Sequence, residues 1–580
     1  MQNLARSVPL PVRQRAYAMV PSPLWRMMRR VATGQSRPQV AWRRTRTRIF
    51  HLSSGQRSAS TAAVEVQGVT YVALRTPTFR SGTVIARHLT LVADAFEKHD
   101  VPYFVLDAQS ERRRVVVVAE EHRSEALAAL QAELRDQPTY LARVRDKTID
   151  SPRLIGRTAL PRSARVIRVF QVLVSDSGSF LAGPVLGCDV EFWHRVASAK
   201  PALFNGEPIP AGTLVAPRRN PWADVIIPTE QKTVRRPVDG TPRPVLDTIA
   251  HPHLFTVTEP IDVVYTWVDG SDPAWLARKA AAQEEYYRRT GVLHALAAND
   301  SRFTSRDELR YSMRSLDMYA DWVRHVYLVT DGQVPEWLDT SHPRLTVVTH
   351  EELFGQRGRL PTFNSHAIES QLHRIEGLSE HYLYLNDDVF FGRPVSPSLF
   401  FHSNGIAQFY LSSAKVGLSA ASGRDMPVMS AGKNNRDLVA KMFDRTISNK
   451  FQHVPHALRR TVMLDMEQDF PADFERTAAS QFRNHEDISI SASLSHYYAY
   501  ATGRAVPGTL KYLYADIARD DTANRLTSLL WRRDVDVFCL NDHDSTSADL
   551  LAQGTVIRSF LDSYFPIPSQ FEKTGPVDQP

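Results

Sequence analysis

The sequence predicts an α/β fold with three parts. These are a core built on a Rossmann-like, mostly parallel sheet, a helical insertion in that core, and a small N-terminal α/β domain. Short apolar, β-branched runs alternate with amphipathic helical patterns through residues 258–425. Turns containing Asp, Asn or Gly follow several of these runs, as in sheets that bind ligands at the carboxyl ends of their strands. Residues 426–505 have mainly helical spacing, which indicates the insertion.

The composition indicates a folded chain of several domains. It has 580 residues, of which 43% are hydrophobic, enough to bury a sizeable core. Two cysteines, Cys188 and Cys539, are too few for a disulfide framework and fit a reducing compartment. No apolar run reaches the roughly 18 residues of a membrane-spanning helix, and the basic N-terminus lacks the apolar core of a secretory signal.

The basic character of the chain belongs to its first 60 residues. These carry twelve Arg, no Lys and no acidic residue, so a net charge of +7 leaves about −5 for the remainder (7 minus 12). The segment Pro21–Arg30 predicts a short amphipathic helix on an anionic membrane surface. The alternative is a disordered basic tail. Nothing elsewhere supports a nucleic-acid arm, so no nucleic-acid partner is expected.

Composition and periodicity divide the rest of the chain. Strands are predicted at Val69–Leu74 and Arg114–Ala119, and helices at Ala86–His99 and Ser124–Leu134. The expected order is a small α/β domain at 64–160, a β-rich, irregular connecting region at 165–257, the core at 258–425, a helical region at 426–505, the closing part of the core at 506–565, and a tail at 566–580.

The core is expected to be organised around the stretch His381–Phe391. Its first residues predict a buried strand, which ends abruptly in Asn386-Asp387-Asp388. Two adjacent carboxylates at the end of a buried strand need compensation, and a divalent cation is the usual compensator. The alternative is a turn in which Asn and Asp bond their own backbone.

Arginines upstream of this stretch predict phosphate binding. Arg306, Arg310 and Arg314 follow one another at helical spacing, and Arg302 precedes the helix. Guanidinium groups suit phosphate oxygens, although a solvated face paired with neighbouring carboxylates would give the same pattern. Asp269 follows the first core strand and is a candidate for the nucleotide site.

Histidines and a second Arg/Asp pair complete the candidate set. Asn364 or Ser365 caps a predicted helix, which places His366 at an anion-attracting N-terminus. His453 and His456 flank Pro455, so we expect a helix entry that presents one imidazole. Arg483 and Asp487 are expected to form a salt bridge or to bind a phosphate and a metal. These residues are all read from the sequence.

Four separated blocks lie within roughly residues 258–545: Ile261–Gly270, Arg302–Gly392, His453–His456 with Phe482-Arg483 and Glu486-Asp487, and Phe538–Asp542. In order and content they resemble the Stealth family of sugar-1-phosphate transferases. The second block is long and specific. The family includes bacterial capsule and exopolysaccharide phosphotransferases, and the catalytic subunit of the animal enzyme that tags lysosomal proteins with N-acetylglucosamine-1-phosphate.

The resemblance implies a reaction in which a glycan hydroxyl attacks the sugar-bearing phosphate of a nucleotide-diphosphate sugar. A phosphodiester forms and a nucleoside monophosphate leaves. The donor is expected to carry a hexose or N-acetylhexosamine, with UDP favoured over GDP. Two alternatives stay open: a metal-dependent glycosyltransferase, which would release the nucleoside diphosphate, and a non-catalytic glycan-binding protein.

The resemblance also implies residue roles in a cytoplasmic bacterial enzyme. Peripheral contact of residues 1–60 with the inner face of the membrane, and homo-oligomerisation, are left open. Asp387 and Asp388 would hold Mg²⁺ or Mn²⁺, with Asp487 as a further ligand. Arg302, Arg310 and Arg483 would bind phosphate oxygens, and His453 or His366 would take the acceptor proton. Further substrate-binding residues are expected at Asp269, Arg314, Asn364, Ser365 and His456.

Overall fold

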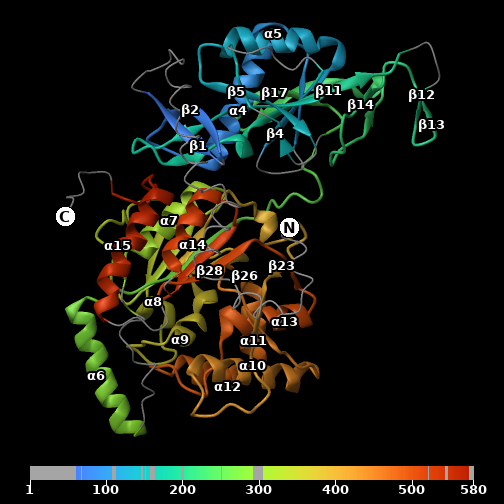
Figure 1. Cartoon of the computed structure of the whole chain (residues 1–580). Helices are drawn as coiled ribbons and strands as arrows, with labels where there is room; N and C mark the ends of the chain where they lie inside the picture. The colour runs from blue at the N-terminus through green and yellow to red at the C-terminus, as the bar shows by residue number, and fades with distance from the viewer. Residues whose placement is uncertain are drawn as a thin grey trace, which may run out of the picture. The chain divides into compact units, whose positions relative to one another are not determined.

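The computed structural model (Figure 1) describes residues 60–66, 68–107, 113–145, 148–150, 152–156, 163–197, 202–249, 251–291, 303, 305–519, 521–541 and 547–573. The described residues up to Arg75 and those from Thr76 onward form separate compact units. In the first unit, β1 (Thr61–Val66) and β2 (Val69–Arg75) form an antiparallel hairpin. Ser60 apart, the basic segment 1–60 lies outside the described residues, so its predictions stay predictions.

Within the second unit, residues 104–246 contribute a mixed sheet with the strand order β16-β17-β3-β4-β11-β8-β5-β6. β4 (Arg114–Ala119) pairs in parallel with β11 (Cys188–Arg195), and β5 (Thr139–Arg145) pairs antiparallel with β8 (Val166–Gln171). The predicted boundary between 64–160 and 165–257 is therefore wrong, because strands from both segments alternate in one sheet. The other strands of this region are β3 (Phe104–Asp107), β6 (Thr148–Ile149), β7 (Arg153–Leu154), β9 (Leu173–Val174), β10 (Phe180–Ala182), β12 (Ala202–Phe204), β13 (Glu207–Ile209), β14 (Leu214–Val215), β15 (Val225–Ile226), β16 (Thr233–Val238) and β17 (Thr241–Leu246).

Both faces of β4 are covered. α4 (Ser81–Lys98) and α5 (Arg123–Leu134) pack together on one face, where their apolar residues share a core with Val116 and Val118. Val115 and Val117 pack on the opposite face with Trp193. A continuous apolar run is the pattern of a strand buried on both sides, so the strand and both helices predicted here are confirmed.

A five-stranded sheet with the order β20-β19-β18-β21-β26 organises the second half of the chain. Central β18 (Ile261–Thr266) pairs in parallel with β19 (Val326–Thr330) and with β21 (His381–Asn386), and β19 pairs in parallel with β20 (Leu345–Thr349). β26 (His456–Arg459) closes the edge antiparallel to β21. The α/β class is confirmed, and the strand order reverses between β18 and β21.

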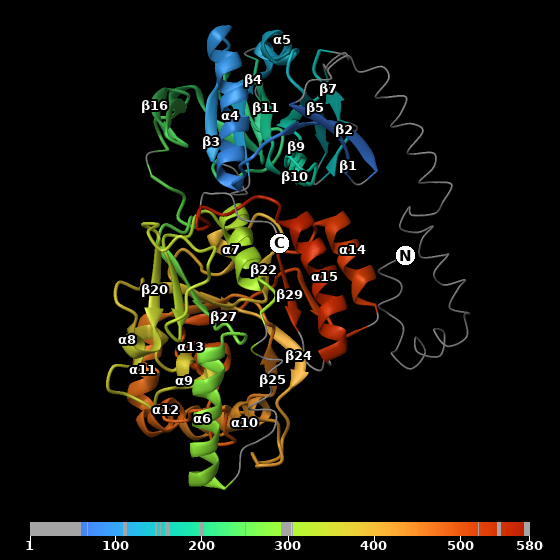
Figure 2. The ribbon, with the colours of Figure 1, turned by 90° about the vertical axis from the view of Figure 1, so that its left-hand side faces the viewer.

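A second, three-stranded sheet continues directly from the first. After a two-residue turn, the chain leaves β21 and enters β22 (Val389–Phe391), which pairs antiparallel with β29 (Val537–Asn541). β28 (Tyr512–Asp516) runs parallel to β29. α7 (Glu308–Tyr319) packs on β22, and α14 (Thr522–Arg532) contacts both β28 and α15 (Ser547–Tyr564). Figure 2 shows α14 and α15 side by side. The turn at residues 387–388 therefore joins two sheets.

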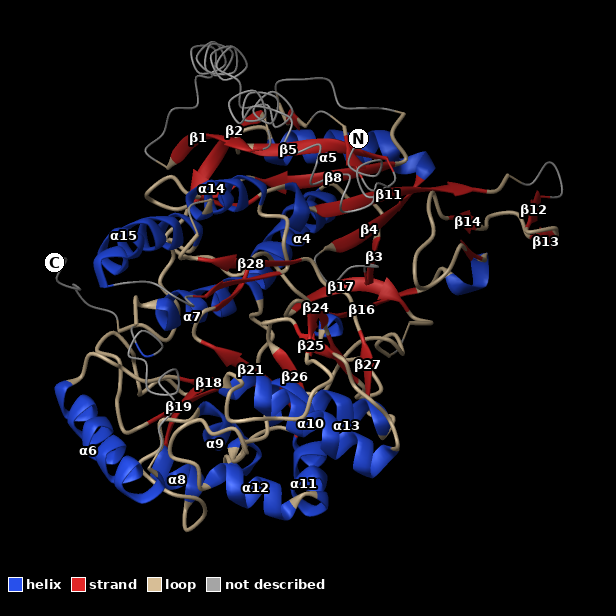
Figure 3. Ribbon diagram, turned by 60° about the horizontal axis from the view of Figure 1, so that its bottom comes forward, coloured by secondary structure: helices blue, strands red, loops and turns tan. Residues whose placement is uncertain are grey.

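The predicted helical region is mostly helical, but it also supplies a strand to the core sheet. Because β26 lies within residues 426–505, the insertion is not a separate helical unit. α11 packs against both α12 and α13, and α9 contacts α12 (Figure 3, helices in blue). The helices of this group are α9 (Ser365–Glu369), α10 (Pro427–Phe443), α11 (Arg460–Asp469), α12 (Pro471–Ala478) and α13 (Ser495–Ala501).

The other helices and strands of the second half of the chain are α6 (Pro273–Thr290), α8 (His350–Phe354), β23 (Ala407–Phe409), β24 (Leu411–Lys415), β25 (Asn449–Phe451) and β27 (Ala505–Pro507).

The predicted tail at 566–580 is wrong for its described part, residues 566–573. Phe571 is 1% exposed and Glu572 is 6% exposed. The Asp339 N–H donates to the Phe571 carbonyl at 2.8 Å, and the Lys573 N–H donates to the Trp337 carbonyl at 2.9 Å. Two backbone hydrogen bonds and a buried aromatic ring therefore fix this segment on the core.

Helix length and polarity decide whether a helix can span a membrane. α4, α6 and α15 each have 18 residues. Across the described stretches of the chain, no helix combines the length and apolar character needed to cross a bilayer.

Candidate active site

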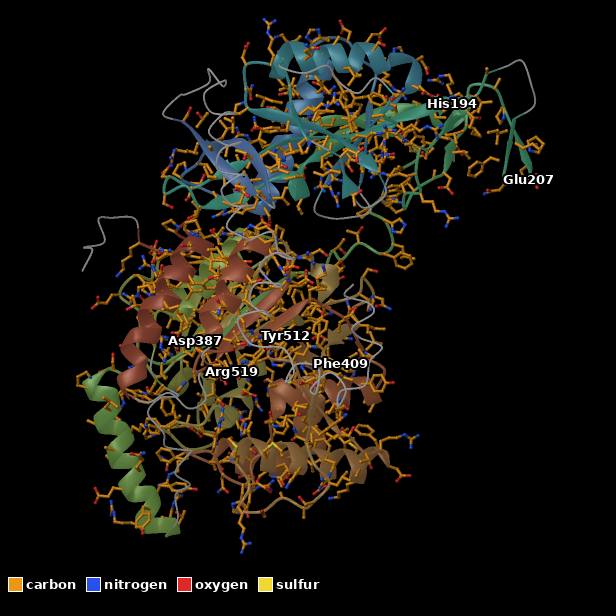
Figure 4. All side chains as sticks on the ribbon, in the orientation of Figure 1. His194, Glu207, Asp387, Phe409, Tyr512 and Arg519 are labelled. Atoms are coloured by element: carbon orange, nitrogen blue, oxygen red, sulfur yellow. The ribbon has the colours of Figure 1, made fainter. Side chains whose placement is uncertain are left out.

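The turn between β21 and β22 carries Asn386, Asp387 and Asp388 at the carboxyl end of the core sheet. β21 is buried through Leu385, so the polar residues begin where the strand leaves the core. The Leu540 N–H on β29 donates to the Asp388 carbonyl at 3.0 Å. The label of Asp387 in Figure 4 marks where this turn lies on the ribbon. The turn is therefore held by both sheets.

Asp388 lies among three side chains from distant parts of the chain. Asn541 Nδ2 donates to Asp388 Oδ2 at 2.9 Å, and Cys539 Sγ lies 3.4 Å from the same oxygen. Burial and the charge of Asp388 raise the pKa of the Cys539 thiol well above its usual value, so the thiol donates to the carboxylate. His453 Nδ1 lies 3.1 Å from Cys539 Sγ and 3.7 Å from Asp388 Oδ2. Its Nε2 accepts from Asn386 Nδ2 at 2.7 Å, so the ring is held at both nitrogens.

Glu308 brings a third carboxylate to the turn from the N-terminus of α7. Two fully buried serines fix this helix to β22. Ser312 Oγ donates to the Val389 carbonyl at 2.5 Å, and Ser315 Oγ accepts from the Phe391 N–H at 3.0 Å. Because Ser312 lies about one turn and Ser315 about two turns from Glu308, the helix cannot slide along β22 without breaking these bonds.

The three carboxylates influence one another. Burial and the charges of Glu308 and Asp388 raise the pKa of Asp387 well above its usual value. Burial also raises the pKa of Glu308, and Asp388 contributes to this rise. Arg306 Nη1 lies 3.5 Å from Glu308. Like charges confined at one partly buried place favour a cation among them.

The carboxylate turn fits a divalent cation. Asp388 Oδ1 is buried and has no hydrogen-bond partner. Asp262, buried on β18, shows the contrast, because Arg324 Nε donates to it at 2.8 Å and the Ser379 N–H at 2.7 Å. Among the residues that the structure describes, no Lys or Arg forms an ion pair with either Asp387 or Asp388. Oxygen ligands from carboxylates suit Mg²⁺ and Mn²⁺.

A second polar cluster forms at α9. Asn364 caps this helix by accepting from the His366 N–H at 3.1 Å, and its Nδ2 donates to Asp487 Oδ2 at 2.8 Å. His366 Nδ1 lies 3.6 Å from the same Asp487 oxygen. Arg483 Nη2 donates to Ser365 Oγ at 2.7 Å. Five residues predicted for the site therefore meet here.

This cluster is buried and incompletely hydrogen-bonded. Burial raises the pKa of Glu369 and lowers that of Arg483. Burial raises the pKa of Tyr384 on β21, and the charges of Glu369 in this cluster and of Asp387 in the carboxylate turn add to the rise. Four of its buried atoms lack a hydrogen-bond partner: Arg483 Nε, His366 Nδ1, Asp487 Oδ1 and Glu369 Oε2.

Arg310 and Arg314 are bound to a carboxylate of the fold. Arg314 donates to both oxygens of Glu572 at 2.7 Å, and Arg310 Nε donates to one of them at 2.6 Å. The structure thus gives both arginines a partner within the fold, Glu572, and their phosphate-binding role stays a prediction. Arg302 lies outside the described residues.

His456 also serves the fold. It begins strand β26 instead of the predicted helix, and its Nδ1 lies 2.9 Å from His496 Nε2. Burial lowers the pKa of His456 well below its usual value, and its expected substrate contact stays a prediction. Asp269 lies in the turn after β18, where its Oδ1 accepts from the Ser271 N–H at 2.8 Å. Its nucleotide-site role stays a prediction.

Four residues of the two clusters were not predicted: Glu308, Glu369, Cys539 and Asn541. One sequence signal could have found Asn541. The chain repeats Asn-Asp at the end of two strand patterns, at Asn386-Asp387 and at Asn541-Asp542. The structure brings Asn386 and Asn541 to the same turn through β22 and β29.

Comparisons with known proteins match the same regions. Models of Stealth protein conserved regions 1, 2, 3 and 4 match residues 259–287, 302–409, 452–500 and 527–579. Exopolysaccharide phosphotransferase SCO6023 of Streptomyces coelicolor is 45% identical over 87% of this chain and 85% of that protein. Exopolysaccharide phosphotransferase CpsY of Mycobacterium tuberculosis is 36% identical over 84% of this chain and 88% of that protein. A solved galactosyltransferase, LgtC, is 9% identical with a TM-score of 0.26 over 53% of this chain and 96% of that one, too low to support any argument.

Proposed function

Because the chain belongs to the Stealth family of phosphotransferases, we propose that it transfers a sugar-1-phosphate from a nucleotide-diphosphate sugar to a glycan hydroxyl. The acceptor oxygen attacks the phosphorus that carries the sugar, the bond to the second phosphate breaks, and a nucleoside monophosphate leaves. The product is a sugar–phosphate–sugar diester. Such a transfer depends on positioning and charge neutralisation more than on covalent catalysis.

The carboxylate turn is the observation that supports this proposal most. Asp387, Asp388 and Glu308 would hold Mg²⁺ or Mn²⁺, which would neutralise charge on the diphosphate. The raised pKa of Asp387 and the unpaired Asp388 Oδ1 show carboxylates whose charge the fold leaves uncompensated. The turn lies where the strand order reverses between β18 and β21, the place where Rossmann-like sheets bind nucleotides.

His453 is the better of the two predicted general bases. Its side chain is 28% exposed, whereas that of His366 is 3% exposed. A base must reach the acceptor hydroxyl, so the more accessible imidazole at the carboxylate turn suits the role. Cys539 and Asn386 contact its two nitrogens and would keep the ring aimed, and Nε2 would take the proton when the acceptor hydroxyl replaces the Asn386 amide.

The cluster at α9 suits the donor's phosphates and sugar. Arg483 carries a buried guanidinium with one unpaired N–H, which fits a phosphate oxygen. Asp487 was expected to bind metal, but its hydrogen bond from Asn364 and its proximity to His366 favour a positioning role. Glu369 could accept a hydrogen bond from a sugar hydroxyl. A UDP-sugar and a glycan acceptor would be the partners.

The nucleotide product tests the proposal. Purified protein with Mg²⁺ is given a panel of UDP- and GDP-sugars and an oligosaccharide acceptor, and the released nucleotide is identified by chromatography. We expect a nucleoside monophosphate and a diester product. Release of the diphosphate alone would instead establish a glycosyltransferase.

A pair of aspartate variants tests the metal role. Asp388→Asn should slow transfer by about a hundredfold or more, as loss of one key charge-stabilising group typically does. Asp339→Asn is the matched control, because Asp339 caps an exposed turn by accepting from Ser341. Equal activity of the two variants would show that Asp388 is a turn residue only.

A further inference from the structure

Asp388, His453 and Cys539 place an oxygen, a nitrogen and a sulfur atom around one point. Their separations are 3.1 Å for Cys539 Sγ to His453 Nδ1, 3.4 Å for Sγ to Asp388 Oδ2, and 3.7 Å for Nδ1 to Oδ2. In a tetrahedral zinc site, with Zn–S near 2.3 Å and Zn–N and Zn–O near 2.0–2.1 Å, ligand atoms lie roughly 3.3–3.6 Å apart. The three atoms therefore outline one face of such a tetrahedron with shifts of a few tenths of an ångström.

We propose that these three side chains form a second cation site, which prefers Zn²⁺ or another thiophilic divalent cation to Mg²⁺. Magnesium takes oxygen ligands in octahedral geometry, whereas thiolate and imidazole ligands select zinc. The set differs in this way from Asp387, Asp388 and Glu308, which offer oxygens only. The fourth position of the tetrahedron is left for water or a substrate oxygen.

The neighbouring side chains can support such a site. Asn386 contacts the far nitrogen of His453 at 2.7 Å. When its amide turns so that Oδ1 accepts from Nε2–H, the Nδ1 lone pair is free to bind a cation. The Cys539 thiol proton then passes to solvent as the thiolate binds. Cys539 is fully buried, so a cation would enter from the side of His453 and Asp388, whose side chains are 28% and 16% exposed.

Cation binding at this site has a consequence for the reaction. The cation would bind the imidazole that takes the acceptor proton and also one oxygen of the carboxylate turn. The site would therefore make transfer sensitive to inhibition by zinc at saturating Mg²⁺. This consequence rests on the proposed function, whereas the binding rests on the geometry alone.

Cobalt binding to the full-length protein tests the site without any reference to activity. Co²⁺ substitutes for Zn²⁺ and gives intense visible bands in a tetrahedral site and a near-ultraviolet band when a thiolate binds it. We expect both from the wild type and from Cys188→Ala, whose cysteine lies in the N-terminal sheet. We expect Cys539→Ser to lose the near-ultraviolet band. Persistence of that band in Cys539→Ser, or its absence from the wild type, would overturn the proposal.

Two further measurements keep the test decisive if Cys539→Ser folds poorly. X-ray absorption at the zinc edge of the wild type should show one sulfur near 2.3 Å with nitrogen or oxygen ligands, and a sulfur-free shell would overturn the site. Cys539→Ala is a second variant, and its zinc inhibition should be at least about tenfold weaker than that of the wild type, since loss of even an outer partner of a metal ligand costs this much. Undiminished zinc inhibition of a folded Cys539→Ala protein would overturn the site. A protein that binds cobalt through Cys539 yet transfers no sugar-phosphate would count against the proposed function alone.

Discussion

Removal of the Glu572 carboxylate should destabilise the core and leave donor binding unchanged. Arg314 is 7% exposed, and Glu572 Oε1 and Oε2 both accept from it at 2.7 Å. Loss of one partner of a buried pair costs about 3–5 kcal/mol, because the other charge stays buried without compensation. Arg310 is more exposed and adds about 1 kcal/mol at most. We expect Glu572→Ala to speed hydrogen exchange in α7 by roughly 10²- to 10⁴-fold, measured by mass spectrometry.

A double variant separates a structural role from phosphate binding. Arg314→Met combined with Glu572→Leu removes both charges, and such apolar replacement of a buried pair is often close to neutral. The double variant should recover most of the exchange protection and keep the wild-type KM for the donor. A raised KM in the double variant, with α7 protected as in the wild type, would refute the reasoning and return Arg314 to the phosphate site.

Three other perturbations give separate tests. Glu308→Gln should raise the Mg²⁺ concentration for half-maximal transfer at least about tenfold; an unchanged requirement in a Mg²⁺ titration would remove Glu308 from the cation site. Burial lowers the pKa of His496 to about 3 and that of His456 well below its usual value. Both stay neutral when folded, so stability is full above pH 6.5 and falls toward pH 3 by about 1.4 kcal/mol per imidazole per pH unit. Melting curves between pH 7 and 5 should show this, with a smaller slope for His496→Phe, and equal slopes would contradict it. Protein lacking residues 1–60 should lose binding to anionic vesicles in a sedimentation assay and keep turnover on soluble acceptors; undiminished binding would remove the membrane interpretation.

The carboxylate turn could be predicted because its signal is local. A buried strand that stops at Asn386-Asp387-Asp388 shows both the burial and the uncompensated charge within eleven residues. The cap at Asn364 could be predicted for the same reason, since a helix cap and the N–H that donates to it lie two residues apart.

Arg314 shows that a local pattern cannot identify the distant partner of a charged side chain. Its helical spacing with Arg310 is compatible with a phosphate, with solvent or with a distant carboxylate, and Glu572 lies 258 residues further along the chain. His456 is similar, since Pro455 argued against a helix interior but could not reveal the pairing of His456 with Tyr384 across β26 and β21. The parallel pairing of Val115 with Asp189 likewise joined two segments that composition had separated.

The two-sheet support of the Asp387-Asp388 turn fixes when a newly made chain can become active. β21 and the carboxylates leave the ribosome well before β29, which supplies Asn541 and Cys539 to Asp388. The segment that holds Glu572 follows later still. Because domains fold in the order in which they are synthesised, a ribosome-bound chain would expose an unsupported carboxylate turn until the last strand emerges. Sugar-phosphate transfer would therefore begin only after nearly all of the chain has been translated.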